Sequence, residues 1–141
     1  MTTEVNSAIT PTGLLGHTSA PAPGKVTPSA ARTLLGIETF GITMQVASDA
    51  ADTFYIILKA PLAFTINSLT YKTTASTVTA AVQIEGSNVT GLSALSCTTS
   101  ETTTNATAAN SVAAGNDVTI VLTSPGTSGS RLVFTLNCTR A

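Results

Sequence analysis

The sequence predicts an all-β protein: an antiparallel β-sandwich, jelly-roll-like, of about seven or eight strands, preceded by an extended N-terminal arm with one short helix. Three observations lead to this. Four of the six prolines lie before residue 38. From about residue 38, apolar and polar residues alternate with a period of two. Turn sequences rich in Gly, Asn, Asp and Pro separate the alternating runs. We therefore expect an attachment arm at 1–37 and a β-sandwich domain at 38–141.

The arm contains one segment with helix signals. Its run Ala20-Pro21-Ala22-Pro23 favours extended backbone. Further on, Thr27 suits an N-cap, Pro28 suits the first helical position, and Gly36 suits the C-terminal end. A helix of two turns is not stable alone. The apolar face of this helix is therefore expected to dock on the chain's own domain, on another copy or on a partner.

The strands are expected wherever alternation is sustained. The clearest runs cover 54–59, 62–71, 78–84, 118–123 and 131–138, and weaker ones cover 42–46, 92–97 and 101–109. Within 62–71 the apolar phase shifts by one residue, which predicts a β-bulge near Asn67-Ser68. The chain has 28 threonines, a residue whose branched carbon favours strands while its hydroxyl tolerates water.

Composition excludes several functions. Charged residues make up only 9% of the chain, against about 25% in a typical soluble domain. Six scattered Lys and Arg residues do not form the basic stripe that nucleic acid requires. No apolar run is long enough to cross a membrane, and the start at Met1 does not resemble a signal peptide. A surface with so few charges favours assembly with other subunits.

No catalytic constellation is evident, so we expect a protein that is not an enzyme and has no catalytic, cofactor-binding or metal-binding residues and no cofactor. The single histidine, His17, lies in the arm, which does not hold the geometry that a general base needs. Asp49 and Asp52 are spaced to share a calcium ion, but hydrogen bonding within a turn is the favoured interpretation.

The two cysteines, Cys97 and Cys138, leave two interpretations open. Both fall on the apolar phase of their strands, so they can be neighbours across the sandwich and form a disulfide. The favoured alternative is a pair of buried thiols that act as small apolar residues. Two Cys and one His do not make a structural zinc site within one chain.

Two segments of the arm carry a family resemblance. They are Leu14-Leu15-Gly16-His17, followed by small residues, and Ser29-Ala30-Ala31-Arg32-Thr33-Leu34-Leu35-Gly36. They look like linker segments of tailed-bacteriophage fibre proteins, which often carry Leu-Leu-Gly-Arg and later Ser-Ala-x-Ala-Arg-x-Leu-Leu-Gly. His17 stands where Arg is usual. The remainder, roughly Thr53 to Arg140, is similar in composition to small Thr/Ala-rich phage virion proteins.

The resemblance implies a non-enzymatic structural protein located in the virion. Such a protein is a homotrimeric head fibre, capsid decoration or spike subunit, whose partners are its own copies and other capsid or tail proteins. The shortness of the chain favours a head fibre or decoration protein over a full tail fibre. The anchoring residues are expected to be Leu14, Leu15, Leu34 and Leu35. The alternative is that these leucines fold back on their own domain.

Outward-facing apolar residues are expected at the interface between subunits, unless both sheets bury them within one chain; these are Ile57, Val121 and Val133. Two other functions stay open. One is a module at a tail-fibre tip that binds a host receptor or glycan and so has the host cell surface as a partner. The other is a secreted surface or adhesin domain with a Cys97–Cys138 disulfide, which requires a precursor with a leader.

Overall fold

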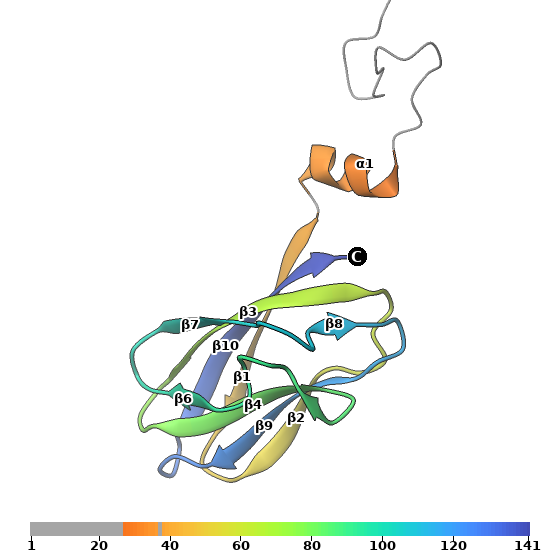
Figure 1. Cartoon of the computed structure of the whole chain (residues 1–141). Helices are drawn as coiled ribbons and strands as arrows, with labels where there is room; N and C mark the ends of the chain where they lie inside the picture. Colours follow the sequence, from red (N-terminus) through yellow and green to blue (C-terminus); the bar gives the residue numbers. More distant parts are fainter. Residues whose placement is uncertain (1–26, 37) are drawn as a thin grey trace, which may run out of the picture. The chain divides into compact units, whose positions relative to one another are not determined.

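The computed structural model describes residues 27–36 and 38–141 (Figure 1). The chain divides into two units between Glu38 and Thr39. Helix α1 (Pro28–Leu35) belongs to the first unit, and every strand of the described chain belongs to the second, the β-domain. Leu14, Leu15 and His17 lie outside the described residues.

Helix α1 begins and ends at the residues that the sequence predicts. The backbone N–H of Ala30 donates to Oγ1 of Thr27 over 3.1 Å, which is an N-cap bond. At the other end Gly36 has a φ of 66°, the left-handed conformation typical of a residue that follows a helix.

The β-domain contains ten strands among its described residues. They are β1 (Thr39–Ala47), β2 (Asp52–Ile57), β3 (Phe64–Thr73), β4 (Val78–Ile84), β5 (Ser87–Asn88), β6 (Leu95–Cys97), β7 (Thr102–Asn105), β8 (Ser111–Val112), β9 (Val118–Ser124) and β10 (Arg131–Arg140). The count exceeds the predicted seven or eight because β5 and β8 are pairs of residues, too short to show any alternation.

The strands form two antiparallel sheets, so the all-β prediction is confirmed. One sheet has the order β1-β10-β3-β7, with β8 also paired to β3. The other has the order β2-β9-β4-β5, with β6 also paired to β4. The chain passes from one sheet to the other at each step from β1 to β4, and again from β8 to β9 to β10 (Figure 1).

The predicted bulge in β3 is confirmed. Ser68 pairs with Asn137, and Ile66 pairs with the next residue, Cys138, so that Asn67 is the extra residue. The bulge restores the inward direction of the apolar residues on both of its sides: Ile66 and Leu69 are both fully buried.

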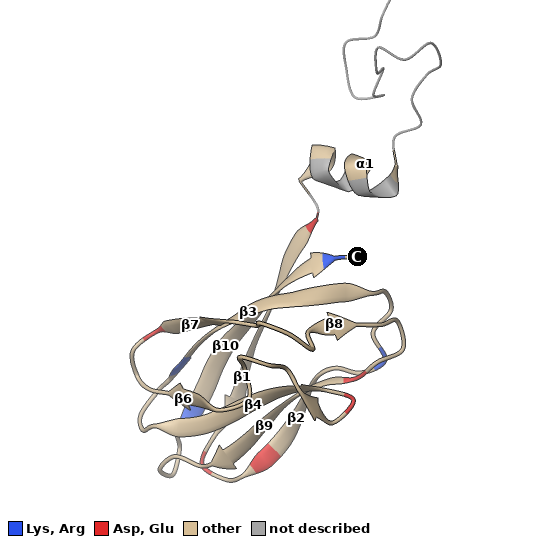
Figure 2. Cartoon of the chain, viewed as in Figure 1, with Lys and Arg blue, Asp and Glu red and all other residues tan. Residues whose placement is uncertain are grey.

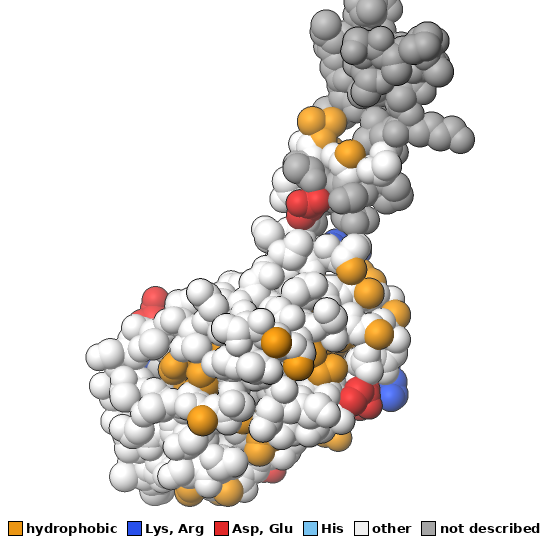
Figure 3. All heavy atoms as spheres, viewed as in Figure 1, with side chains coloured by type: hydrophobic (Ala, Val, Ile, Leu, Met, Phe, Trp, Pro, Cys, Tyr) orange, Lys and Arg blue, Asp and Glu red, His pale blue; other side chains and the backbone are white. Residues whose placement is uncertain are grey.

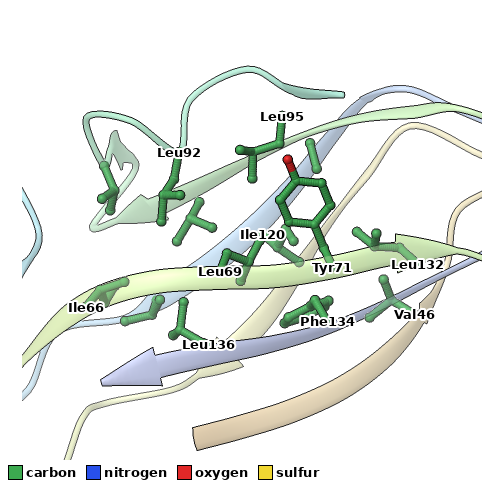
Figure 4. Close-up of a cluster of buried hydrophobic side chains, with 14 of the residues drawn as sticks. Val46, Ile66, Leu69, Tyr71, Leu92, Leu95, Ile120, Leu132, Phe134 and Leu136 are labelled. Atoms are coloured by element: carbon green, nitrogen blue, oxygen red, sulfur yellow. The ribbon is translucent and has the colours of Figure 1, made fainter. Parts of the chain in front are cut away.

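The core lies between the two sheets and is shared by both. In Figure 4, Leu69 and Tyr71 of β3 lie beside Phe134 and Leu136 of β10, and Ile120 comes from the opposite sheet. This burial supplies the main driving force for folding, and it explains the alternation in β10, where every second residue from Leu132 to Cys138 is buried.

The two long edges of the sandwich differ. The edge made by β5 to β8 is closed by backbone hydrogen bonds between Thr90 and the segment 107–108, at 3.0 Å and 2.8 Å. Under it Val89 and Leu92 are fully buried. The other edge, made by β1 and β2, is lined by half-buried apolar residues that pack on the core: Phe40, Ile42, Met44, Phe54, Ile56 and Ile57.

Candidate functional site

Two of the four predicted anchors, Leu34 and Leu35, lie in the last turn of α1. Their side chains are 55% and 58% exposed, while Ala31 of the same face is half-buried. An apolar side chain left in water forgoes about 1.5–3 kcal/mol of burial energy. The helix therefore presents a pair of apolar side chains that gain from contact with a partner. Which surface they dock on stays a prediction.

The β1/β2 edge is a second apolar feature. Strand β1 pairs only with β10, and β2 pairs only with β9, so each has one side without a strand partner in the described chain. The inward side chains of this edge, among them Ile42, Met44 and Phe54, are only partly buried. Sequence analysis did not identify this surface, because alternation shows which residues point inward but not which strands lie at an edge.

The residues predicted at the subunit interface are Ile57, Val121 and Val133, and all three are half-buried. The outward direction predicted for Ile57 is wrong: the register shifts between Tyr55 and Ile57, and Ile57 packs against the core. Val121 pairs with Thr53 and Ala81 on the outer face of the β2-β9-β4 sheet. Val133 pairs with Lys72 and Gln45 on the outer face of the other sheet. On the face of the β-domain seen in Figure 3, apolar side chains form separate spots among polar atoms.

Cys97 and Cys138 are free thiols in the structure. Their side chains are buried, and they belong to β6 and β10, in different sheets. Burial raises the pKa of each thiol to about 12, because the thiolate would lose its hydration. The structure thus describes two neutral side chains that pack as part of the core. A disulfide between them stays a prediction.

The carboxylates considered for calcium accept hydrogen bonds from backbone N–H groups, a neighbouring one for Asp52 and one 80 residues away for Asp49. Asp49 Oδ2 accepts from the N–H of Gly129 over 3.3 Å, and Asp52 Oδ1 accepts from the N–H of Thr53 over 2.7 Å. Within the described chain no group of three or more His, Cys, Asp or Glu side chains is placed to hold a metal ion. Charged residues are few and scattered over the β-domain (Figure 2), apart from Lys59 and Asp117, which pair at 3.7 Å.

No protein-family model matches the sequence, and no curated protein matches it significantly. Among the described residues, no helix has the length and apolar character needed to cross a membrane.

The structure reveals a polar hollow that sequence analysis missed. It lies on the outer face of the β2-β9-β4 sheet and is lined by Tyr55 together with Gln83, Glu85 and Asp117. The one sequence signal for this hollow was the strand alternation, which places Tyr55 on the outer face, opposite to Phe54. Tyr55, the pair Gln83 and Glu85, and Asp117 come from three distant parts of the chain, so only the sheet order brings them together.

Proposed function

We propose that this protein is a non-enzymatic structural subunit of a bacteriophage virion, a homotrimeric head fibre, decoration or spike subunit attached through its N-terminal arm. The observation that carries the proposal is the exposed pair Leu34 and Leu35 on a capped helix, in a unit separate from the β-domain. Such a helix gains stability only by docking. The proposal places the dock on a neighbouring virion protein or copy.

The strand order supports a finer description of the fold as a jelly roll. In a jelly roll the chain crosses repeatedly between two four-stranded sheets, and the first strand of the chain pairs with the last. Here β1 pairs with β10 and β2 pairs with β9. Jelly rolls are frequent in viral capsid and lectin domains. This support is an analogy at the level of the fold, since one fold serves many functions.

The β1/β2 edge supports the homotrimer. Its row of half-buried apolar residues is continuous with the core and ends at a strand edge that no strand of the described chain pairs with. Monomeric proteins usually cover or charge such an edge, and this chain covers its opposite edge with the segment 85–110. Contact between copies along β1 and β2 would complete the burial that one chain leaves unfinished.

The low charge of the chain fits the same proposal. The described β-domain contains one ion pair, between Nζ of Lys59 and Oδ1 of Asp117 at 3.7 Å, and Lys59 is largely exposed. Threonine and serine are together the most frequent exposed residues of the β-domain, and their hydroxyls can be buried between subunits at a smaller desolvation cost than charges.

The proposal is tested by light scattering of the full chain after size-exclusion chromatography. We expect three times the chain mass of 14.2 kDa. A strict monomer at micromolar concentration would contradict the trimer. Proteomic analysis of purified particles of the phage that encodes the chain tests the location, and we expect the chain among the virion proteins.

The anchoring role is tested by the double variant Leu34→Asp/Leu35→Asp. Binding to particles should be lost because the new charges resist burial, while the melting temperature of the β-domain is unchanged. The matched control is Ser96→Asp/Thr102→Asp, which adds the same two charges at exposed positions of the β-domain. Equal binding by both double variants would contradict anchoring through α1.

A further inference from the structure

The polar hollow on the β2-β9-β4 sheet has the composition of a ligand site. Its volume is about 240 Å³, slightly below the roughly 300–1,000 Å³ of sites for drug-sized molecules. It combines one aromatic ring, three hydroxyls, one amide and two carboxylates, from Thr53, Tyr55, Gln83, Glu85, Asp117 and Thr119. A hollow of this volume holds about one six-membered ring, so a larger ligand would place only one of its rings in it.

Strand register aligns three of these side chains across the sheet. Tyr55 of β2 pairs with Thr119 of β9, and Thr119 pairs with Gln83 of β4. Paired residues of antiparallel strands point to the same face. Thr119 is buried at 7% exposure, whereas Tyr55 is 57% exposed. The small threonine therefore forms the floor, and the tyrosine ring rises beside it with much of its surface open to solvent.

The two carboxylates that line the hollow, those of Glu85 and Asp117, are held in place by hydrogen bonds. Oε1 of Glu85 accepts from the backbone N–H of Asp117 over 2.6 Å. Oδ1 of Asp117 accepts from the backbone N–H of Lys59 over 2.8 Å. Each carboxylate is thus oriented through one oxygen, and its second oxygen has no hydrogen bond from a described residue. Such fixed acceptors bind hydroxyl groups with little loss of side-chain entropy.

Gln83 is oriented in the same way. Its Nε2 donates to Oδ1 of Asn88 over 2.9 Å, which leaves its carbonyl oxygen as a further acceptor. The hollow therefore offers an apolar ring face next to several fixed acceptors. A sugar ring has the matching chemistry, since its C–H face is apolar and its hydroxyls are donors.

We propose that this hollow binds a neutral saccharide unit, with Tyr55 as the stacking platform and Glu85, Asp117 and Gln83 as hydrogen-bond acceptors for ring hydroxyls. The two carboxylates select against sulfated or sialylated glycans by charge repulsion. Lys59 is the one basic side chain in contact with them among the described residues, and it is already paired with Asp117. The site gives a structural subunit a means of touching a glycan-coated surface.

The experiment screens the full chain against an array of immobilised neutral and anionic glycans, and then titrates the best neutral glycan in solution by NMR. We expect binding of a neutral glycan, with amide shifts concentrated at Tyr55, Gln83 and Asp117. Tyr55→Ala should weaken binding about tenfold or more, because the stacking surface is lost. Tyr55→Phe should stay within about twofold of the wild type, because it keeps the ring.

The control is Thr103→Ala, an exposed position on the other sheet, which should leave the affinity unchanged. Melting temperatures verify that each variant is folded. Any of three results overturns the proposal: no glycan on the array is bound, only anionic glycans are bound, or Tyr55→Ala binds as well as the wild type. The oligomeric state is measured without glycan, so a failure here is distinguishable from a failure of the proposed virion role.

Discussion

Thr73 carries a buried hydroxyl that lacks a hydrogen bond. Its side chain is 3% exposed, and Oγ1 has no partner among the described residues. Burying a polar atom without a partner costs about 1–3 kcal/mol.

We predict that Thr73→Val, which keeps the shape and removes the hydroxyl, raises the free energy of unfolding by about 1 kcal/mol. Urea denaturation measures this change. The matched control is Thr70→Val on the same strand, where Oγ1 bonds Oγ1 of Thr103 over 2.9 Å and the substitution should destabilise. A Thr73→Val protein less stable than the wild type would show that the hydroxyl has a partner in solution.

The buried thiols predict an alkaline loss of stability. The pKa of Cys97 and Cys138 is about 12 in the folded chain, against 9.0 for an ordinary thiol. Between these values the unfolded chain releases protons that the folded chain retains, so stability falls as pH rises from 9 toward 12. The slope is about 1.4 kcal/mol per pH unit and thiol at most.

The measurement compares urea denaturation of the wild type and of Cys97→Ala/Cys138→Ala from pH 7 to 11. The difference in unfolding free energy between the two proteins should be constant below pH 8 and should shrink above pH 9. This comparison removes the contributions of lysine and tyrosine, which both proteins share. A difference that is independent of pH would mean that the thiols are not desolvated.

At the scale of elements, the closed edge depends on the close approach of two segments at Gly91. This residue has a φ of 89°, and a Cβ built on it would lie 2.5 Å from the backbone oxygen of Asn105. Gly115 has a similar φ of 90°, but its Cβ would meet nothing within 4 Å.

We predict that Gly115→Ala lowers the free energy of unfolding by about 1 kcal/mol, because alanine is strained in the left-handed conformation but its Cβ meets no neighbour. Gly91→Ala should cost about 1–3 kcal/mol more, because the segments 89–92 and 105–108 must also separate. Chemical denaturation of both variants gives the two values. Equal losses of unfolding free energy in the two variants would indicate that the segments 89–92 and 105–108 can separate without an energetic cost.

The strands differ in how clearly the sequence indicates them. Strands β3, β4, β9 and β10 were predictable because each has one fully buried face, which imposes alternation on the sequence. The bulge at Asn67 was predictable because the apolar phase changes there. Leu92–Cys97 was predicted as one strand, but only Leu95–Cys97 is extended, since Leu92 is buried in a turn.

The segment 85–112 was poorly predictable for a related reason. Its conformation is set by hydrogen bonds to distant residues, such as those from Ala106 N to Asn67 O and from Asn110 Nδ2 to Ile66 O. The hollow at Tyr55 depends in the same way on contacts between remote strands. Helix α1 was predictable, because helix caps and helical spacing are local signals; the exposure of Leu34 and Leu35 was not, because folding back on their own domain stayed open.

At the scale of the whole molecule, the division between Glu38 and Thr39 predicts an independent β-domain. Removal of residues 1–37 should leave a protein that unfolds in one transition, with a melting temperature within a few degrees of the full chain. Calorimetry measures this. The truncated protein should also fail to join virions, and normal incorporation would show that the arm is not the attachment segment.

The pairing of β1 with β10 and of β2 with β9 has a consequence for the nascent chain. During synthesis, β1 and β2 leave the ribosome long before β10 and β9, their strand partners in the described chain, and β1 must wait for the ten-residue strand β10. The sandwich can therefore be completed only after β10 has left the ribosome. Until then two apolar strands are open to pairing with neighbouring nascent chains. Where many copies are synthesised together, this delay lets two copies associate before the sandwich of either one is complete.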